Sequence, residues 1–325
     1  MRAIVIERPG DEQVLQLGEV PPPLPGPHDL LINVSHAGVN RADLMQRQGF
    51  YPPPPGASPL LGLECAGTVA AMGAQVTGWR VGDRAMALLA GGGYAAQAVV
   101  DQGSAMHVPP TLSDAEAAGI PEVFLTAFVN LFMLAGVQAG ETVLVHGGGS
   151  GVGTASIQLL REAAARSLVT AGSAAKCEHC LHFGADVAIN YRDGSFVPKV
   201  KAATNDRGAD VILDSIGAAY LAQNLEALAH SGRLVLIGLM KGAKTEIDLT
   251  AVLRRHLKIF GSTLRARPVA EKAAIVTAFL ERFGPALEAG RLRPPIHAVI
   301  PLAQAAEAHR MMQASEHFGK IILKV

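Results

Sequence analysis

A glycine-rich turn at residues 147 to 153 is the stretch of this sequence best suited to chemistry. It follows a short apolar run, Thr142 to His146, long enough for one buried strand, and helical periodicity begins near Val152. A strand leading into a glycine turn and a helix holds a pyrophosphate, because missing Cβ atoms let the backbone approach and the first helical N–H groups point at the phosphates. Ser150 stands where the strict G-x-G-x-x-G pattern has its middle glycine, although its hydroxyl can donate to a phosphate. By itself the turn fits nucleotide binding and a ligand-free βα turn equally well.

The segment after the second predicted strand indicates which nucleotide binds. A sheet that binds NAD usually carries an acidic residue about 20 residues after the glycine turn, where it holds the ribose hydroxyls. Here no carboxylate occurs, and Ser173 and Lys176 offer a hydroxyl and an ammonium one helical turn apart. Charge-assisted hydrogen bonds to a 2′-phosphate, about 1.5–3 kcal/mol each, would favour NADP by roughly a hundredfold or more. We predict NADPH, against the alternative that Lys176 is an ordinary surface lysine.

The cysteines of the chain raise the question of a metal site. Cys177-Glu-His-Cys180 with His182 has the C-x-x-C spacing of a zinc site, but no second pair of ligands follows at a suitable distance. The segment also reads as a helix, on which two cysteines are small residues facing a sheet. We predict no metal there, and we interpret Cys65 as a core residue.

Length and composition limit the class of protein. The 325 residues favour two domains, and 49% hydrophobic with 17% charged residues is ample for a core. Lys+Arg and Asp+Glu are both 28, which gives no argument for nucleic acid as a partner. The apolar run at Ala3 to Ile6 is too short for a signal peptide, and Val123 to Val137 is too short to span a bilayer. We read the second run as a buried helix and expect a soluble, cytoplasmic protein without a membrane partner.

The first 120 residues read as β-rich, with runs separated by Pro and Gly clusters. One helix is expected near Arg41 to Gln48, and Ser113 with Glu116 has the outline of a capping box that opens another. The expected strands are Met1 to Ile6, Leu30 to Ser35, Gly67 to Ala71, Arg84 to Leu89 and Tyr94 to Val99.

From residue 141 the pattern alternates between strand and helix. Besides Thr142 to His146, the expected strands are Leu168 to Thr170, Val187 to Asn190, Val211 to Asp214, Leu234 to Gly238 and Lys258 to Phe260. The expected helices are Ala174 to Phe183, Ala219 to His230 and Leu249 to His256. Six strands with crossover helices predict a doubly wound parallel sheet, an α/β fold. A helix at Leu302 to Gln313 and a strand at Lys320 to Val325 follow, and the strand is expected to return to the first domain.

Nine stretches spread over the chain carry a resemblance to a known family. They are Asn40 to Gly49, Pro53 to Ser58, Leu61 to Glu64, Ala85 to Leu89, Ile120 to Glu122, Leu125 to Phe128, Ser150 to Ala155, Leu168 to Ser173 and Gly238 to Met240. These stretches resemble the zinc-free quinone oxidoreductases, the zeta-crystallin-like family of the medium-chain dehydrogenase/reductase superfamily. The branch that looks nearest is the tumour-suppressor-inducible one of animals.

The resemblance implies a GroES-like catalytic domain, residues 1–122 and 267–325, and a Rossmann domain, residues 123–266, with NADPH in the cleft between them. It also implies a homodimer paired through the strand Lys258 to Phe260. Zinc-bearing relatives hold their catalytic metal with a Cys and a His at the places of Asn40 and Leu63, and neither residue can replace those ligands. We therefore expect a metal-free enzyme.

The resemblance further assigns roles to single residues. Asn40, Asp43 and Thr126 are expected near the nicotinamide, and Tyr51 where the substrate cleft opens. The expected catalytic residues are Asn40, Asp43 and Tyr51. Tyr191 and Arg267 are equally well read as surface residues. The residues expected to bind the cofactor are Thr126, Ser150, Gly151, Val152, Gly172, Ser173, Lys176, Tyr191, Gly238, Leu239, Met240, Leu264, Arg265 and Arg267.

A metal-free site limits the reaction. Without a Lewis acid a simple ketone is hard to reduce, whereas a quinone is electron-poor and its reduced anion is delocalised. We predict hydride transfer from NADPH to a quinone in the interdomain cleft, with Tyr51 or water as a weak proton donor. The alternatives are a 2-alkenal or enone reductase and an NADPH-binding scaffold with little catalysis.

Overall fold

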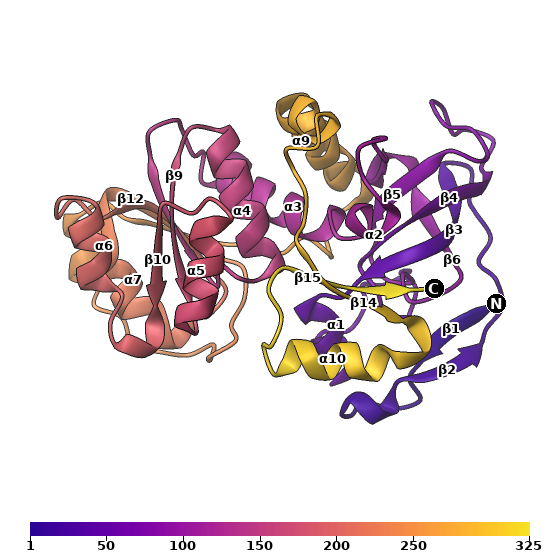
Figure 1. The fold of residues 1–325 in the computed structure, drawn as a ribbon, viewed down its shortest axis with the longest axis horizontal. Helices are drawn as coiled ribbons and strands as arrows, with labels where there is room; N and C mark the ends of the chain where they lie inside the picture. The colour runs from indigo at the N-terminus through magenta and orange to yellow at the C-terminus, as the bar shows by residue number, and fades with distance from the viewer. The chain divides into compact units, whose positions relative to one another are not determined.

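The computed structural model describes residues 1–325 and divides into two compact units (Figure 1). The first unit combines Met1–Leu125 with Leu264–Val325, and the second is the continuous stretch Thr126–Thr263. The boundaries expected from the sequence, 122/123 and 266/267, each differ from these by three residues. The first unit therefore draws on both ends of the chain.

The second unit is a six-stranded sheet in which every neighbouring pair is parallel. Its order, β10-β9-β8-β11-β12-β13, changes direction between β8 and β11, and ligands bind at such a switch point, outside the carboxyl ends of the strands. The strands are β8 (Thr142–His146), β9 (Arg166–Ala171), β10 (Val187–Asn190), β11 (Ala209–Asp214), β12 (Leu228–Leu236) and β13 (Lys258–Gly261). This confirms the predicted doubly wound fold.

Helices connect these strands, and apolar side chains from both kinds of element form the core, with Leu144, Leu168 and Ile212 fully buried. The helices are α4 (Gly151–Glu162), α5 (Ala174–His182), α6 (Val197–Ala203), α7 (Leu221–Ala227) and α8 (Leu249–Arg254). The helix expected to reach His230 ends at Ala227, because β12 already begins at Leu228. Short 3₁₀ turns lie at Tyr191–Asp193 and Ala218–Tyr220.

The first unit contains a seven-stranded sheet in the order β14-β15-β3-β4-β5-β7, with β6 paired to β3, and a separate hairpin of β1 and β2. The hairpin strands are β1 (Arg2–Val5) and β2 (Gln16–Glu19), and the sheet strands are β3 (Asp29–Gly38), β4 (Glu64–Met72), β5 (Arg84–Leu88), β6 (Gln97–Asp101), β7 (Ala105–His107), β14 (Ile296–Pro301) and β15 (Lys320–Lys324). Because β15 pairs antiparallel with β3, the expected return of the last strand to the first domain is confirmed.

The helices of the first unit include one that the sequence did not predict, the 20-residue α9 (Val269–Glu288). The others are α1 (Arg41–Arg47), α2 (Asp114–Ala117) and α10 (Ala305–Gln313), with 3₁₀ turns at Glu12–Val14, Gln102–Ser104 and Leu302–Gln304. The helix α3 (Pro121–Phe128) begins in the first unit and ends in the second. The capping box of Ser113 and Glu116 at α2 is present.

Two expectations for single elements need correction. The apolar run at residues 123–137 is not one regular helix, because α3 gives way to a π-helical segment at Val129–Leu134. The strand expected from Tyr94 begins only at Gln97, since the Tyr94 carbonyl accepts from the Ile4 N–H outside the sheet.

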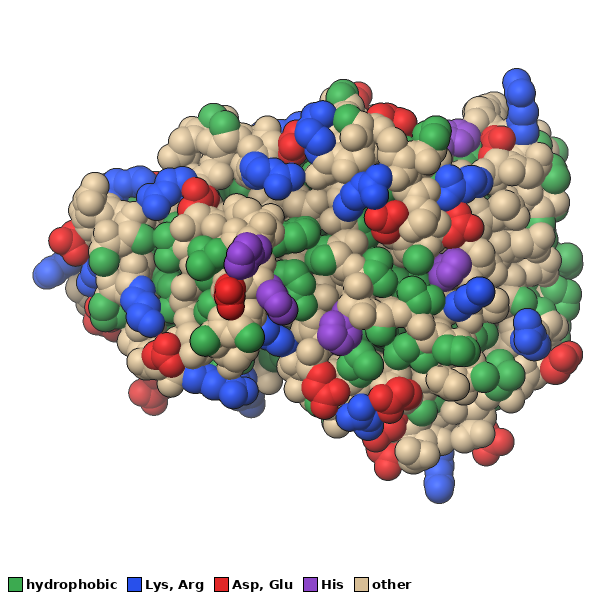
Figure 2. All heavy atoms as spheres, viewed as in Figure 1, with side chains coloured by type: hydrophobic (Ala, Val, Ile, Leu, Met, Phe, Trp, Pro, Cys, Tyr) green, Lys and Arg blue, Asp and Glu red, His purple; other side chains and the backbone are tan.

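None of the helices combines the length and the apolarity that crossing a lipid bilayer requires. On the face drawn in Figure 2, Lys and Arg side chains are interspersed with Asp and Glu, so no field of one sign dominates it.

Candidate cofactor and active site

The glycine turn has the close packing that a phosphate-binding turn needs. Ser150 is the N-cap of α4, and its Oγ accepts a hydrogen bond from the Gly153 N–H at 3.0 Å. A Cβ on Gly148 would lie 2.6 Å from the Cβ of Val169, and one on Gly153 would overlap the Gly147 carbonyl oxygen. The N–H groups of the first turn of α4, including those of Gly151 and Val152, point out of the helix without an intrahelical acceptor. These residues therefore fit a pyrophosphate.

A buried polar network lies next to this turn, at the carboxyl ends of the strands. His146, the last residue of β8, contacts Thr170 Oγ1 at 3.1 Å through Nδ1 and Asn224 Oδ1 at 2.7 Å through Nε2. Asn224 Nδ2 donates to Asp214 Oδ2 at 3.0 Å. Burial lowers the pKa of His146 to about 4, so the ring is neutral at physiological pH. The network ties the carboxyl ends of β8, β9 and β11 together. Sequence reasoning missed it, although polar side chains at the ends of apolar strands were a usable signal.

The residues expected around a 2′-phosphate gather after β9. Ser173 is the N-cap of α5, with its Oγ accepting from the Lys176 N–H at 3.2 Å. Tyr191 lies beside Gly172, where an added Cβ would come within 2.5 Å of the Tyr191 hydroxyl. Lys241 Nζ lies 5.8 Å from the centre of the Tyr191 ring. Lys241 is a second ammonium that sequence reasoning missed, and its place directly after Gly238 to Met240 was the available signal.

The remaining residues predicted to bind cofactor are dispersed. Leu239 and Met240 are 53% and 52% exposed after β12, where an added ligand can reach them. Thr126 lies on α3, and its carbonyl accepts from Asn130 Nδ2 at 2.8 Å. Leu264 is buried, and Arg267 pairs with Glu271 at 3.3 Å. Their contacts with a cofactor stay predictions.

In the first unit, Asn40 belongs to a buried ionic cluster with Glu64 and Lys320. Glu64 Oε1 accepts from Lys320 Nζ at 2.6 Å and from Asn40 Nδ2 at 2.9 Å. Lys320 Nζ also donates to Asn40 Oδ1 at 2.8 Å and to the Val39 carbonyl. Both atoms of the Asn40 amide are therefore engaged, so its expected role near the nicotinamide would be to shape the site. Lys320 and Glu64 were not identified as site residues from the sequence.

Asp43 is fully buried at the start of α1. Its carboxylate accepts from the N–H groups of Asn40 at 2.8 Å and Gly62 at 3.1 Å, and from the Tyr94 hydroxyl at 3.2 Å. Tyr94 in turn contacts His309 Nε2 at 3.2 Å. Burial, opposed by these hydrogen bonds, raises the pKa of Asp43 to about 6. The side chain thus holds the loops around Asn40 and Gly62, which is a structural basis for its predicted place in the site.

Tyr51 lies in a loop that Arg265 holds in place. The guanidinium of Arg265 donates to the Tyr51 carbonyl at 3.1 Å, to the Ala90 carbonyl at 2.8 Å and to Gln46 Oε1 at 2.6 Å, and it lies 5.3 Å from the Tyr51 ring centre. All three nitrogens of Arg265 donate hydrogen bonds within this unit. The geometry therefore favours a role for Arg265 in holding the Tyr51 loop, and not the expected contact with the cofactor.

The residues at the place of a catalytic metal do not fit one. No group of three or more His, Cys, Asp or Glu side chains is placed to hold a metal ion. Leu63 is buried and has no donor atom, Asn40 has both amide atoms engaged, and the Lys320 ammonium lies against Glu64. A cation adjacent to that ammonium would be repelled. No step of the reaction is therefore assigned to zinc. Cys177 and Cys180 are buried on α5 and are free thiols.

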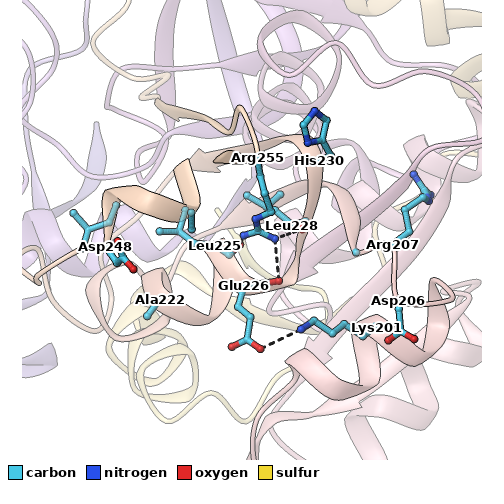
Figure 3. A pocket seen from close by; sticks show the side chains of 13 residues that line it. Lys201, Asp206, Arg207, Ala222, Leu225, Glu226, Leu228, His230, Asp248 and Arg255 are labelled. Atoms are coloured by element: carbon cyan, nitrogen blue, oxygen red, sulfur yellow. Dashed lines mark hydrogen bonds and ion pairs between the residues drawn. The ribbon is translucent and has the colours of Figure 1, made fainter. Parts of the chain in front are cut away.

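A surface hollow of about 490 Å³ lies elsewhere on the second unit (Figure 3). It is lined at the amino ends of β11 and β12 by Gly208 and Leu228, opposite the edge that carries the glycine turn. Two of its basic side chains are already engaged, since Lys201 pairs with Glu226 at 3.2 Å and Arg255 donates to the Leu228 carbonyl at 2.8 Å.

Known proteins resemble this chain over most of its length. Residues 26–110 match the profile of the alcohol dehydrogenase GroES-like domain, and residues 151–281 match that of the zinc-binding dehydrogenases. The chain is 33% identical to the quinone oxidoreductase of Lama guanicoe, over 99% of this chain and 97% of that protein. It is 35% identical to the phthioceranic/hydroxyphthioceranic acid synthase of Mycobacterium tuberculosis over 98% of its length, but it spans only 15% of the synthase.

Solved structures superpose over the whole chain. The CurK enoyl reductase has a TM-score of 0.88 at 28% identity and covers 99% of this chain and 98% of its own. A mycobacterial protein complexed with NADPH has a TM-score of 0.88 at 28% identity and full coverage of both chains.

Proposed function

Since the chain belongs to the quinone oxidoreductase family of the medium-chain dehydrogenases/reductases, we propose that it is an oxidoreductase that transfers hydride from NADPH to a quinone. The family supplies the reaction class and a nicotinamide cofactor. The choices of NADPH and of a quinone are our inference. A homodimer paired through β13 and a cytoplasmic location also stay predictions.

The observation that supports a quinone as the substrate is the ionic cluster of Asn40, Glu64 and Lys320. It includes Asn40, which the resemblance places where zinc-bearing relatives keep a ligand of a metal that polarises carbonyls, and its donor atoms are mutually satisfied. A substrate that needs no such polarisation fits best, and a quinone is electron-poor enough to accept hydride when it is held in position.

The chain's own residues would bind the cofactor and orient it and the substrate. The glycine turn and the N-terminus of α4 support the pyrophosphate, and Ser173 with Lys176 favours a 2′-phosphate. Bound there, NADPH supplies the hydride. Asp43 fixes the loops that carry Asn40 and Gly62, while Arg265 holds the loop of Tyr51.

A steady-state assay tests the proposal. Purified protein is given NADPH or NADH with an ortho-quinone, a para-quinone, a 2-alkenal and a cyclic enone, and cofactor oxidation is followed by absorbance. We expect turnover with quinones and a clear preference for NADPH. Tight NADPH binding without turnover of any acceptor would contradict the proposal and favour a scaffold.

A second candidate is an enone or enoyl reductase, favoured by the likeness to the CurK enoyl reductase. Hydride addition to the β-carbon of an α,β-unsaturated carbonyl also yields a delocalised anion, so the same site suits it. Turnover with the 2-alkenal and the enone, but with neither quinone, would select this candidate.

Removal of the Tyr51 hydroxyl is expected to have a modest effect. Tyr51 is partly exposed, and burial raises its pKa, so it remains a neutral phenol and a weak donor. Tyr51→Phe should lower quinone turnover a few-fold and leave NADPH affinity intact, as measured by kcat and by quenching of intrinsic fluorescence. Loss of NADPH binding would refute the placement of Tyr51 at the substrate.

A further inference from the structure

Glu122 is an acidic residue to which the proposed reaction assigns no role. It is the second residue of α3, and its main-chain N–H donates to Glu64 Oε2 at 2.9 Å. Its own Oε2 is buried and makes no hydrogen bond, although the residue as a whole keeps part of its surface exposed. An ionised carboxylate with a buried, unbonded oxygen is costly, whereas the neutral acid is tolerated.

The position of Glu122 on α3 connects it with the expected nicotinamide site. Glu122 and Thr126 are four residues apart on this helix, so their side chains lie on the same helical face. Thr126 is the residue of α3 predicted to contact the nicotinamide. Glu122 is therefore one helical turn from the residue at which that contact is predicted.

Charged groups from several elements surround the Glu122 carboxyl. The carboxylates of Glu64 on β4 and Asp43 on α1 raise its pKa, while Lys320 on β15 and Lys272 on α9 lower it. Burial is the largest influence, and together these raise the pKa of Glu122 to about 8. Glu122 also interacts electrostatically with Tyr51 and Arg265. The group is therefore protonated at neutral pH and ionises just above it.

Lys272 is the most unusual of these neighbours. Its residue is only 6% exposed on α9, and its ammonium makes neither a hydrogen bond nor an ion pair within 4 Å. Burial lowers the pKa of Lys272, and the charge of Glu122 raises it. The positive charge of Lys272 stabilises the ionised form of Glu122 without fixing it in a salt bridge, which suits a group that must lose and regain a proton.

From this arrangement we propose that Glu122 is the general acid that protonates the reduced substrate, with Lys272 stabilising the carboxylate left behind. The inference rests on the proposed function. Hydride transfer oxidises the nicotinamide and gives the quinone two electrons and one hydrogen, which leaves an oxyanion. The O–H bond of Glu122 then breaks, a new O–H bond forms on that oxyanion, and the electron pair stays on the carboxylate. The next proton comes from water.

The pH dependence of the reaction tests this role. In the wild-type enzyme kcat should fall as pH rises through about 8, because the folded-state pKa is raised and the proton is present below it and absent above. Glu122→Gln keeps the shape and the N–H bond to Glu64 but has no acidic proton. We expect kcat to fall about a hundredfold at neutral pH and the alkaline limb to disappear, with the KM for NADPH within about twofold of wild type.

Lys272→Met gives a second readout that a purely structural role would not move. Removing the ammonium should shift the alkaline limb to higher pH, since Lys272 lowers the pKa of Glu122. Glu281→Gln, at an exposed carboxylate on the same helix, is the matched control and should leave the profile unchanged. Infrared difference spectra of the protein without cofactor should show a protonated-carboxyl band that is lost above about pH 8 and is missing in Glu122→Gln.

The outcomes separate this inference from the proposed function. If wild-type protein turns over quinone but Glu122→Gln keeps the same alkaline limb, Glu122 is not the acid. If Lys272→Met leaves the limb in place, the role of Lys272 is wrong. If none of the acceptors supports NADPH oxidation by the wild type, the proposed function fails. The infrared band still reports whether Glu122 is protonated.

Discussion

Lys320→Met should destabilise the protein by about 3–5 kcal/mol. Lys320 is 1% exposed, and its ammonium is the only cation that the Glu64 carboxylate contacts, at 2.6 Å. Methionine fills a similar volume but leaves Glu64 buried with one hydrogen bond from Asn40 Nδ2 and one from the Glu122 N–H. An uncompensated buried charge accounts for most of the expected loss. Urea unfolding followed by circular dichroism measures it.

A paired change shows whether charge or packing is responsible. Lys320→Met combined with Glu64→Gln removes both charges and should recover a substantial part of the lost stability, because the coupling between contacting groups is not additive. Lys324→Met, at the exposed end of the same strand, should change the free energy of unfolding by less than about 0.5 kcal/mol. Equal losses in the single and the paired variant would show that packing, and not the ion pair, dominates.

Lys176→Ala should weaken NADPH binding about 10- to 100-fold and leave NADH binding nearly unchanged. The predicted 2′-phosphate would lie between Ser173, Lys176 and Tyr191, and the loss of one charge-assisted hydrogen bond corresponds to about 1.5–3 kcal/mol. Only NADPH carries that phosphate. Dissociation constants for both cofactors, measured by calorimetry at fixed salt, test the expectation.

Two further lysines refine this experiment. Lys241→Ala should produce a smaller loss of the same kind, since its ammonium lies over the Tyr191 ring. Lys201→Ala is the control, because Lys201 pairs with Glu226 beside the hollow at the other edge of the sheet. An equal loss of NADPH and NADH affinity in Lys176→Ala would contradict the assignment of NADPH as the cofactor.

The sequence predicted well wherever a local pattern determines the structure. Apolar runs bounded by glycine located the strands of the second unit, because parallel strands buried on both faces need such runs. The capping box at Ser113 likewise depends on residues three positions apart. The helix α9 was missed, since Gly284 and Pro285 lie within it and both residues usually end helices.

The site was harder to predict because its groups meet only in the folded chain. Asn40 was expected near the nicotinamide, but its partners Glu64 and Lys320 lie far along the sequence. Glu122 was noted only within a stretch that resembles the family, and no role was assigned to it. Its neighbours Glu64 and Lys272 come from β4 and α9, and no spacing rule connects them with α3. Local motifs can locate a cofactor, whereas a shifted pKa depends on the whole tertiary arrangement.

The late return of β15 has a consequence for how the chain matures on the ribosome. Glu64 and Lys320 are 256 residues apart, so the carboxylate leaves the exit tunnel long before its counter-charge has been synthesised. Residues 126–263 form a continuous unit and can complete their core in the meantime, because domains generally fold as units during synthesis. The first unit cannot complete its sheet until β15 has been synthesised. Until then, the part of β3 that pairs with β15 has no partner strand. Chaperone dependence and misfolding during translation should therefore concentrate in the first unit.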